Sequence, residues 1–213
     1  MQTTFARLLL KHAAERPTAP AMREKEYGIW QALSWSDLAV MVEQLACGLH
    51  AAGLRRDDHM IVVGANRPRL YATMLAVQAL GAVPIPLYQD AAALECVFPI
   101  NNADVSFAFA EDQEQVDKLL EIREQCPQLK NIYFDDPRGL RKYNEPGLAS
   151  LETLLETGKA YAAQHPEFFK SEVNAAKPDD VAAMFFTSGT TGNPKGVVHT
   201  HSTLLGASKS GAD

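Results

Sequence analysis

A glycine- and hydroxyl-rich segment near the end of the chain, TSGTTGNPKG at residues 187–196, combines the residue types that bind a polyphosphate. Its glycines permit backbone angles and a close approach to a ligand that a side chain would block. Successive backbone amides of such a loop can converge on an anion, and Lys195 adds a mobile positive charge. The segment therefore predicts a phosphate-binding loop. A solvated surface turn is the alternative, because the same residue types are frequent in turns.

The spacing of the segment does not fit the Walker A loop, G-x-x-x-x-G-K-[ST]. Pro194 stands five residues beyond Gly189, where that motif requires glycine, and Gly196 follows Lys195, where serine or threonine should bind magnesium. The residues after the loop, Val197-Val198-His199, also predict a strand, whereas a Walker A loop opens a helix. The loop belongs to another class of phosphate site.

The residues that precede the loop alternate between strand and helix patterns, and these elements must position it. Ser34 and Asp37 have the spacing of a capping box, so a helix is expected from there to Gly53. Further helices are expected over 66–81, 92–100, 112–125 and 150–164, and strands over 60–63, 105–110, 131–134 and 181–187. This repetition predicts an α/β fold with mostly parallel sheets flanked by helices.

Two further segments carry separate predictions, one about a strand of the sheet and one about the division of the chain into subdomains. Val83-Pro84-Ile85-Pro86-Leu87 is expected to be extended, and a central place in a sheet is disfavoured because proline donates no ladder hydrogen bond. The polar run Lys177-Pro178-Asp179-Asp180 is a boundary candidate. Residues 1–178 are expected to form an N-terminal α/β subdomain, and residues 179–213 the truncated start of a nucleotide-binding subdomain.

Composition excludes several classes of protein. Hydrophobic residues make up 46% of the 213 residues and the formal net charge is −6, so a core can form and a nucleic-acid partner is disfavoured. Cys47, Cys96 and Cys126 are distant from one another, which is typical of reduced, packed thiols in the cytoplasm. No apolar run approaches the roughly 18–20 residues of a membrane span, although a peripheral membrane contact remains open. We expect a cytoplasmic protein without a signal peptide.

The ten residues of the loop match T-S-G-T-T-G-x-P-K-G, and on them the chain resembles the adenylate-forming superfamily. Acyl- and aryl-CoA synthetases, peptide-synthetase adenylation domains and luciferases are its members. The similarity extends to the S-W-S-D helix start, to VVGANRPRLYATMLAVQALGAVPIPLY and to Thr200-His201 after the loop. REKEYGIWQALSW and EDQEQVDKLLEI resemble the long-chain fatty acyl-CoA synthetase branch most.

The resemblance implies a two-step ligase reaction. A carboxylate attacks the α-phosphate of Mg²⁺-bound ATP to give an acyl-adenylate and pyrophosphate, and coenzyme A then displaces AMP. Donors and a cation around the pyrophosphate would stabilise the charge that develops during the transfer. The resemblance assigns that role to Thr187, Ser188, Gly189, Thr190, Thr191, Gly192 and Lys195. It assigns no catalytic nucleophile within this sequence, since the substrate supplies its own carboxylate. It assigns no metal ligand here either.

The resemblance also places further parts downstream of the loop: an aromatic-Gly-x-Thr-Glu segment, an aspartate for the ribose, an arginine near a hinge and a late catalytic lysine. The chain resembles only the opening third of such enzymes, so we expect an excised or prematurely ended piece that is inactive alone. Two alternatives stay open. One is an aryl-CoA ligase or another carboxylate-adenylating enzyme, and the other is a non-catalytic binding module.

Two other groups of residues have competing interpretations. His199 and His201 would share one face of a strand, which allows a metal site but supplies no third ligand. The resemblance places a histidine after the loop near the acyl or nucleotide site, which makes His201 a candidate neighbour of the substrate. Asp179 and Asp180 could be paired catalytic carboxylates, but solvated turn residues are the favoured interpretation.

Overall fold

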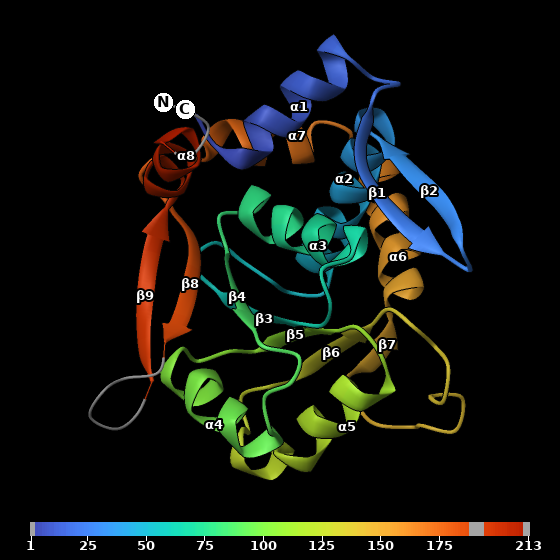
Figure 1. Cartoon of the computed structure of the whole chain (residues 1–213), viewed down its shortest axis with the longest axis vertical. Coiled ribbons are helices and arrows are strands. Elements are labelled where there is room, and N and C mark those ends of the chain that lie inside the picture. The colour runs from blue at the N-terminus through green and yellow to red at the C-terminus, as the bar shows by residue number, and fades with distance from the viewer. Residues whose placement is uncertain (1–2, 188–193, 211–213) are drawn as a thin grey trace.

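A five-stranded parallel sheet forms the centre of the structure, and helices cover both of its faces (Figure 1). The computed structural model describes residues 3–187 and 194–210. Its helices are α1 (Phe5–Glu15), α2 (Trp35–Ala51), α3 (Pro68–Ala79), α4 (Ala93–Asn102), α5 (Gln113–Glu121), α6 (Leu151–Gln164), α7 (Phe168–Ala175) and α8 (His201–Ser210), with a 3-10 turn at Arg123–Gln125. Its strands are β1 (Pro20–Glu26), β2 (Ile29–Ser34), β3 (His59–Val63), β4 (Val83–Leu87), β5 (Phe107–Ala110), β6 (Asn131–Phe134), β7 (Leu148–Ser150), β8 (Val181–Thr187) and β9 (Lys195–Thr200).

The strands of the central sheet follow the order β4-β3-β5-β6-β7, and every neighbouring pair is parallel. The chain steps from β3 outward to β4 and then crosses back to β5 on the other side of β3. Loops at the carboxyl ends of β3 and β5 therefore diverge, which leaves a crevice at that edge of the sheet. β4 is an edge strand of this sheet, as its two prolines predict.

Each strand sends alternate side chains to two separate cores, because successive residues of a strand point to opposite faces. On one face, Met60, Val62 and Phe109 pack among α1, α2, α3, α6 and α7. On the other face, Ile61 and Val63 pack against α4 and α5. The apolar run at residues 60–63 of β3 and the all-apolar β5 follow from this burial on both faces, as in other parallel sheets.

The helix pair α2–α6 packs backbone against backbone and depends on two glycines. A Cβ atom at Gly158 would lie 1.7 Å from the carbonyl oxygen of Gln44, and one at Gly48 would lie 2.4 Å from that of Leu154. The two helix backbones can therefore come into contact only because positions 48 and 158 are both glycine.

The structure confirms the predicted α/β class and adds elements that the patterns did not predict. The capping box at Ser34 and Asp37 is formed, with the hydroxyl of Ser34 accepting from the Asp37 amide at 3.2 Å. The antiparallel hairpin β1–β2, the short strand β7 and the helix α7 were all missed. The helix expected over 112–125 ends at Glu121 and continues only as a 3-10 turn.

Candidate functional site

The predicted phosphate loop connects two antiparallel strands, β8 and β9, whose ladder ends at the pair Thr187 and Lys195. This pairing brings the first and last side chains of the predicted site next to each other at the base of the loop. Lys195 is exposed and forms no ion pair with any described residue. The middle of the site, Ser188, Gly189, Thr190, Thr191 and Gly192, lies outside the described residues. Strand β9 confirms that a strand, and not a helix, follows the loop.

A hollow of about 530 Å³ opens directly beside the base of this loop. It lies at the carboxyl edge of the sheet, where the ends of β3, β4 and β8 come together. Its lining comes from Gly64, Ala65 and Asn66 after β3, from Leu87, Tyr88, Gln89 and Asp90 at the end of β4, and from Phe185, Phe186 and Thr187 of β8. Apolar walls with a few polar groups are typical of small-molecule sites.

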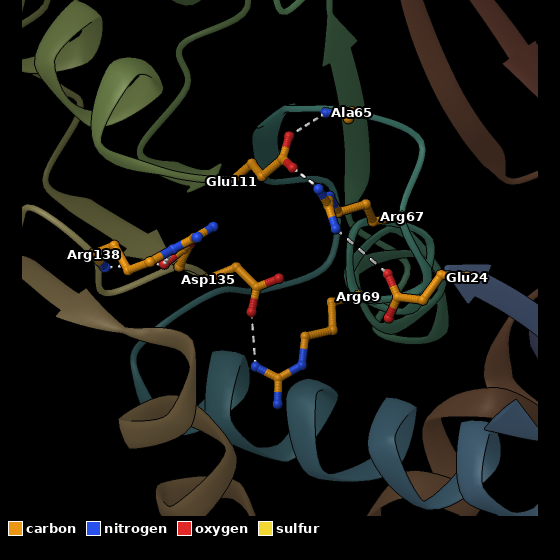
Figure 2. Close-up of polar contacts among 8 residues, drawn as sticks. Glu24, Ala65, Arg67, Arg69, Glu111, Asp135 and Arg138 are labelled. Atoms are coloured by element: carbon orange, nitrogen blue, oxygen red, sulfur yellow. Dashed lines mark hydrogen bonds and ion pairs between the residues drawn. The ribbon is translucent and has the colours of Figure 1, made fainter. Parts of the chain in front are cut away.

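A second hollow of about 480 Å³ lies at the same edge and is lined mainly by charged side chains. Figure 2 shows that its arginines and carboxylates are paired with one another. Arg67 donates to Glu111 at 2.6 Å and lies 3.7 Å from Glu24. Arg69 donates to Asp135 at 2.7 Å, and Arg138 pairs with Asp136. Since these cations are already neutralised, this crevice is a weaker candidate for phosphate than the hollow beside Lys195.

Glu111 follows β5, at the point where the strand order reverses, and its carboxylate binds the turn after β3. Its carboxylate accepts a 2.5 Å hydrogen bond from the amide of Ala65 as well as the one from Arg67 (Figure 2). Gly64 permits this approach, because a Cβ atom there would lie 2.5 Å from the Cβ of Glu111. Partial burial raises the pKa of the Asp135 carboxyl, although the hydrogen bond from Arg69 opposes that rise. These contacts hold the β3–α3 turn that separates the two hollows.

Replacing Glu111 with alanine is expected to lower the free energy of unfolding by about 1–3 kcal/mol, because a partly buried amide and a guanidinium lose their acceptor. Urea unfolding followed by circular dichroism measures the change. Glu114→Ala is the matched control: its side chain is 68% exposed and pairs with Lys118 at the surface, so a change within about 0.5 kcal/mol is expected. Equal effects of the two substitutions would contradict the role given to Glu111.

The two histidines after the loop do not share a strand face, which corrects the prediction. His199 lies on β9 against the ring of Phe185, whereas His201 begins α8 and is 1% exposed. His201 lies at the end of the β8–β9 hairpin opposite to the loop, where its Nδ1 accepts from the amide of Phe5 at 3.4 Å. No group of three or more metal-binding side chains forms anywhere in the described residues.

His201 makes the stability of the fold depend on pH. Burial lowers the pKa of His201 from 6.5 to about 4, against the opposing effect of Asp180 and with a smaller contribution from Arg7. The unfolded chain therefore binds the proton more tightly, so this stability is complete above pH 6.5 and is lost as the pH falls toward 4.

At pH 5 we expect a loss of about 2 kcal/mol relative to pH 7.5 from this residue alone. Urea midpoints across this range measure the loss, and His201→Phe should remove that part of the pH dependence while keeping an aromatic ring beside Phe5. A His201→Phe variant with the same pH slope as the natural chain would show that another group is responsible.

Asp179 and Asp180 are structural, in agreement with the favoured interpretation. The Asp180 carboxylate accepts from the amide of Lys177 at 2.8 Å and from Arg56 at 3.2 Å, and Asp179 accepts from the hydroxyl of Ser202. The pair thus ties the turn before β8 to the start of α8.

Comparisons with known proteins agree with this geometry. The family model of the AMP-binding enzyme matches residues 9–211. A Bos taurus long-chain-fatty-acid–CoA ligase, ACSBG1, is 27% identical over 180 residues, which cover 84% of this chain and 24% of that protein. The Mycobacterium tuberculosis ligase FadD15 is 24% identical over 200 residues, which cover 94% of this chain and 32% of that protein. The chain thus spans about a quarter to a third of the length of these relatives.

Solved structures share the fold. An acetoacetyl-CoA synthetase from Streptomyces lividans superposes with a TM-score of 0.76 at 23% identity, over 96% of this chain and 31% of that one. The N-terminal domain of FACL13 from Mycobacterium tuberculosis superposes with a TM-score of 0.69 at 22% identity, over 93% of this chain and 44% of that one. The expected α/β architecture is therefore confirmed both by the strand order and by these structures.

Proposed function

Because this chain belongs to the AMP-binding enzyme family, we propose that it forms part of an AMP-forming acid–thiol ligase that activates a long-chain fatty acid. The observation that carries this proposal is the cross-strand pair Thr187 and Lys195 beside the 530 Å³ hollow. The names of the similar ligases support the fatty-acid class.

In the proposed reaction the loop binds the departing pyrophosphate end of ATP. Thr187, Ser188, Gly189, Thr190, Thr191 and Gly192 supply amide and hydroxyl donors, and Lys195 supplies the positive charge. Donors fixed around a leaving group stabilise the transition state more than the ground state, because negative charge accumulates there during transfer. The attacking oxygen belongs to the fatty acid, so this chain needs no nucleophile of its own.

The hollow beside Thr187 is the proposed place for the part of the substrate next to the α-phosphate. Phe186, Leu87 and Leu70 give it apolar walls that suit a hydrocarbon chain. Mg²⁺ would enter with the phosphates of ATP, and coenzyme A would be the second substrate. The described residues offer no side-chain cluster for the metal, so no role in the chemistry is assigned to it.

The compartment and the subdomain boundary are further parts of the proposal. All three cysteines are buried free thiols, which agrees with a reducing cytoplasm. Among the described helices, none has both the length and the apolar character required to cross a bilayer. The turn at residues 177–180, which lies between α7 and β8, agrees with a boundary between 178 and 179.

The test is carboxylate-dependent exchange between ATP and pyrophosphate, followed by acyl-CoA formation. It is run on the full translation product of the gene and on the 213-residue chain, with fatty acids of increasing length and with an aryl acid. We expect exchange that rises with fatty-acid length in the full product and none in the 213-residue chain. Preference for the aryl acid would support an aryl-CoA ligase instead. A full product that binds ATP without exchange would support the binding module.

A further inference from the structure

The hairpin β1–β2 places its acidic and its basic side chains on opposite faces. Its first strand reads Arg23-Glu24-Lys25-Glu26, so alternate side chains point to opposite faces. Glu24 and Glu26 line the charged crevice, where Glu24 faces Arg67. Arg23 and Lys25 point to the other face, are exposed and form no ion pair with any described residue. The acidic side chains thus face the body of the protein and the basic side chains face solvent.

The basic face also presents aromatic surface. Cross-strand partners share a face, and the register pairs Lys25 with Trp30 and Arg23 with Ala32. Trp30 is 66% exposed. Ile29 is 65% exposed but pairs with Glu26, so it lies on the opposite face, next to the tip. Figure 1 shows β2 at the right-hand edge of the view, outside β1. Nothing in the described residues covers these side chains.

The tip of the hairpin adds an outlier of backbone geometry. Tyr27 and Gly28 form a two-residue turn with φ angles of 46° and 81°. Turns of this kind favour asparagine, aspartate or glycine at the first position, and a bulky residue there is strained. Tyr27 borders the charged crevice but is 86% exposed, so packing within the chain offsets little of the strain. Such an outlier points to a role for the exposed ring.

We propose that the tip and basic face of the hairpin, formed by Arg23, Lys25, Tyr27, Ile29 and Trp30, dock on the surface of an anionic phospholipid bilayer. Lysine and arginine are attracted to anionic headgroups, and tyrosine and tryptophan settle at the boundary between headgroups and acyl chains. Nucleic acid fits less well, because the aliphatic Ile29 shares the tip. This docking goes beyond the proposed function and does not depend on it.

The docking would place a lipid surface near the candidate site. The hairpin lines the charged crevice, and the Ala65 turn alone separates that crevice from the hollow beside Thr187. Both hollows lie at the carboxyl edge of the same sheet.

The experiment is co-sedimentation of the 213-residue chain with vesicles of phosphatidylcholine, with and without phosphatidylglycerol, at low and high salt. No ATP, coenzyme A or fatty acid is added, so the outcome is separate from that of the exchange assay. We expect binding only to the anionic vesicles, weakened by salt. Lys25→Glu should weaken it roughly thirtyfold, because two unit charges change at the contact. Trp30→Ser should also weaken it, and in the natural chain the tryptophan emission should shift to the blue on binding.

The chain offers matched controls. Leu94 is also 65% exposed but lies on α4, which covers the opposite face of the sheet, and Lys130 precedes β6 at the amino edge. Leu94→Ser and Lys130→Glu should leave vesicle binding unchanged. Trp30→Phe should keep binding but lose the blue shift, since Trp35 packs against His12.

Three results would overturn the proposal. One is an absence of binding to anionic vesicles at low salt, and another is equal weakening by the hairpin and control substitutions. The third is self-association of the lipid-free chain that Trp30→Ser abolishes, which would assign the face to a second copy of the protein.

Discussion

Replacing Lys195 with alanine is expected to slow carboxylate-dependent ATP–pyrophosphate exchange about ten- to hundredfold, because a hydrogen bond to a charged group contributes about 1.5–3 kcal/mol. Lys195 is paired with Thr187 at the base of the loop and forms no ion pair with a described residue, so its charge is available to the phosphates. Exchange is measured on the full translation product with the preferred fatty acid.

Lys177→Ala is the matched control for this prediction. Lys177 is also exposed, but it precedes β8 at the end opposite to the loop. Its replacement should leave exchange unchanged. A folded Lys195→Ala variant with full exchange would contradict the assignment of the loop, whatever the identity of the carboxylic acid.

The second large effect concerns the contact between α2 and α6. Gly158→Val is expected to lower the free energy of unfolding by roughly 3–5 kcal/mol, because the added carbon atoms would overlap the backbone of α2. The backbone of a packed helix cannot rotate away as a flexible side chain would, so the helices must separate. The melting temperature should fall by on the order of 10 °C, as measured by scanning calorimetry.

Gly206→Ala gives the comparison. Gly206 lies within α8, and a Cβ atom there would meet nothing within 4 Å. Alanine is the better helix former by about 1 kcal/mol, so the melting temperature should stay or rise. A Gly158→Val variant as stable as the natural chain would mean that the α2–α6 contact is looser than described.

Local patterns were sufficient for the α/β class and for most of the central elements. The capping box before α2, the prolines of β4 and the apolar runs of β3 and β6 each depend on residues close together in sequence. The hairpin β1–β2 was missed because β1 ends in four consecutive charged residues and β2, which carries no charge, does not alternate apolar with polar residues. Its turn, Tyr27-Gly28, also lacks the residue that usually opens such a turn.

The sequence by itself predicted the phosphate loop from ten adjacent residues, and it determined the two strands beside the loop, which the ladder pair Thr187 and Lys195 joins. Only the tertiary structure decided what surrounds the loop. Arg67 meets Glu111 across 44 residues, and His201 meets Phe5 across 196. No local preference encodes such pairs, because they arise when parallel strands align their carboxyl ends and when the last described helix packs on the first. The physical reason is that spacing along a chain fixes neighbours within one element, whereas packing of elements fixes neighbours between them.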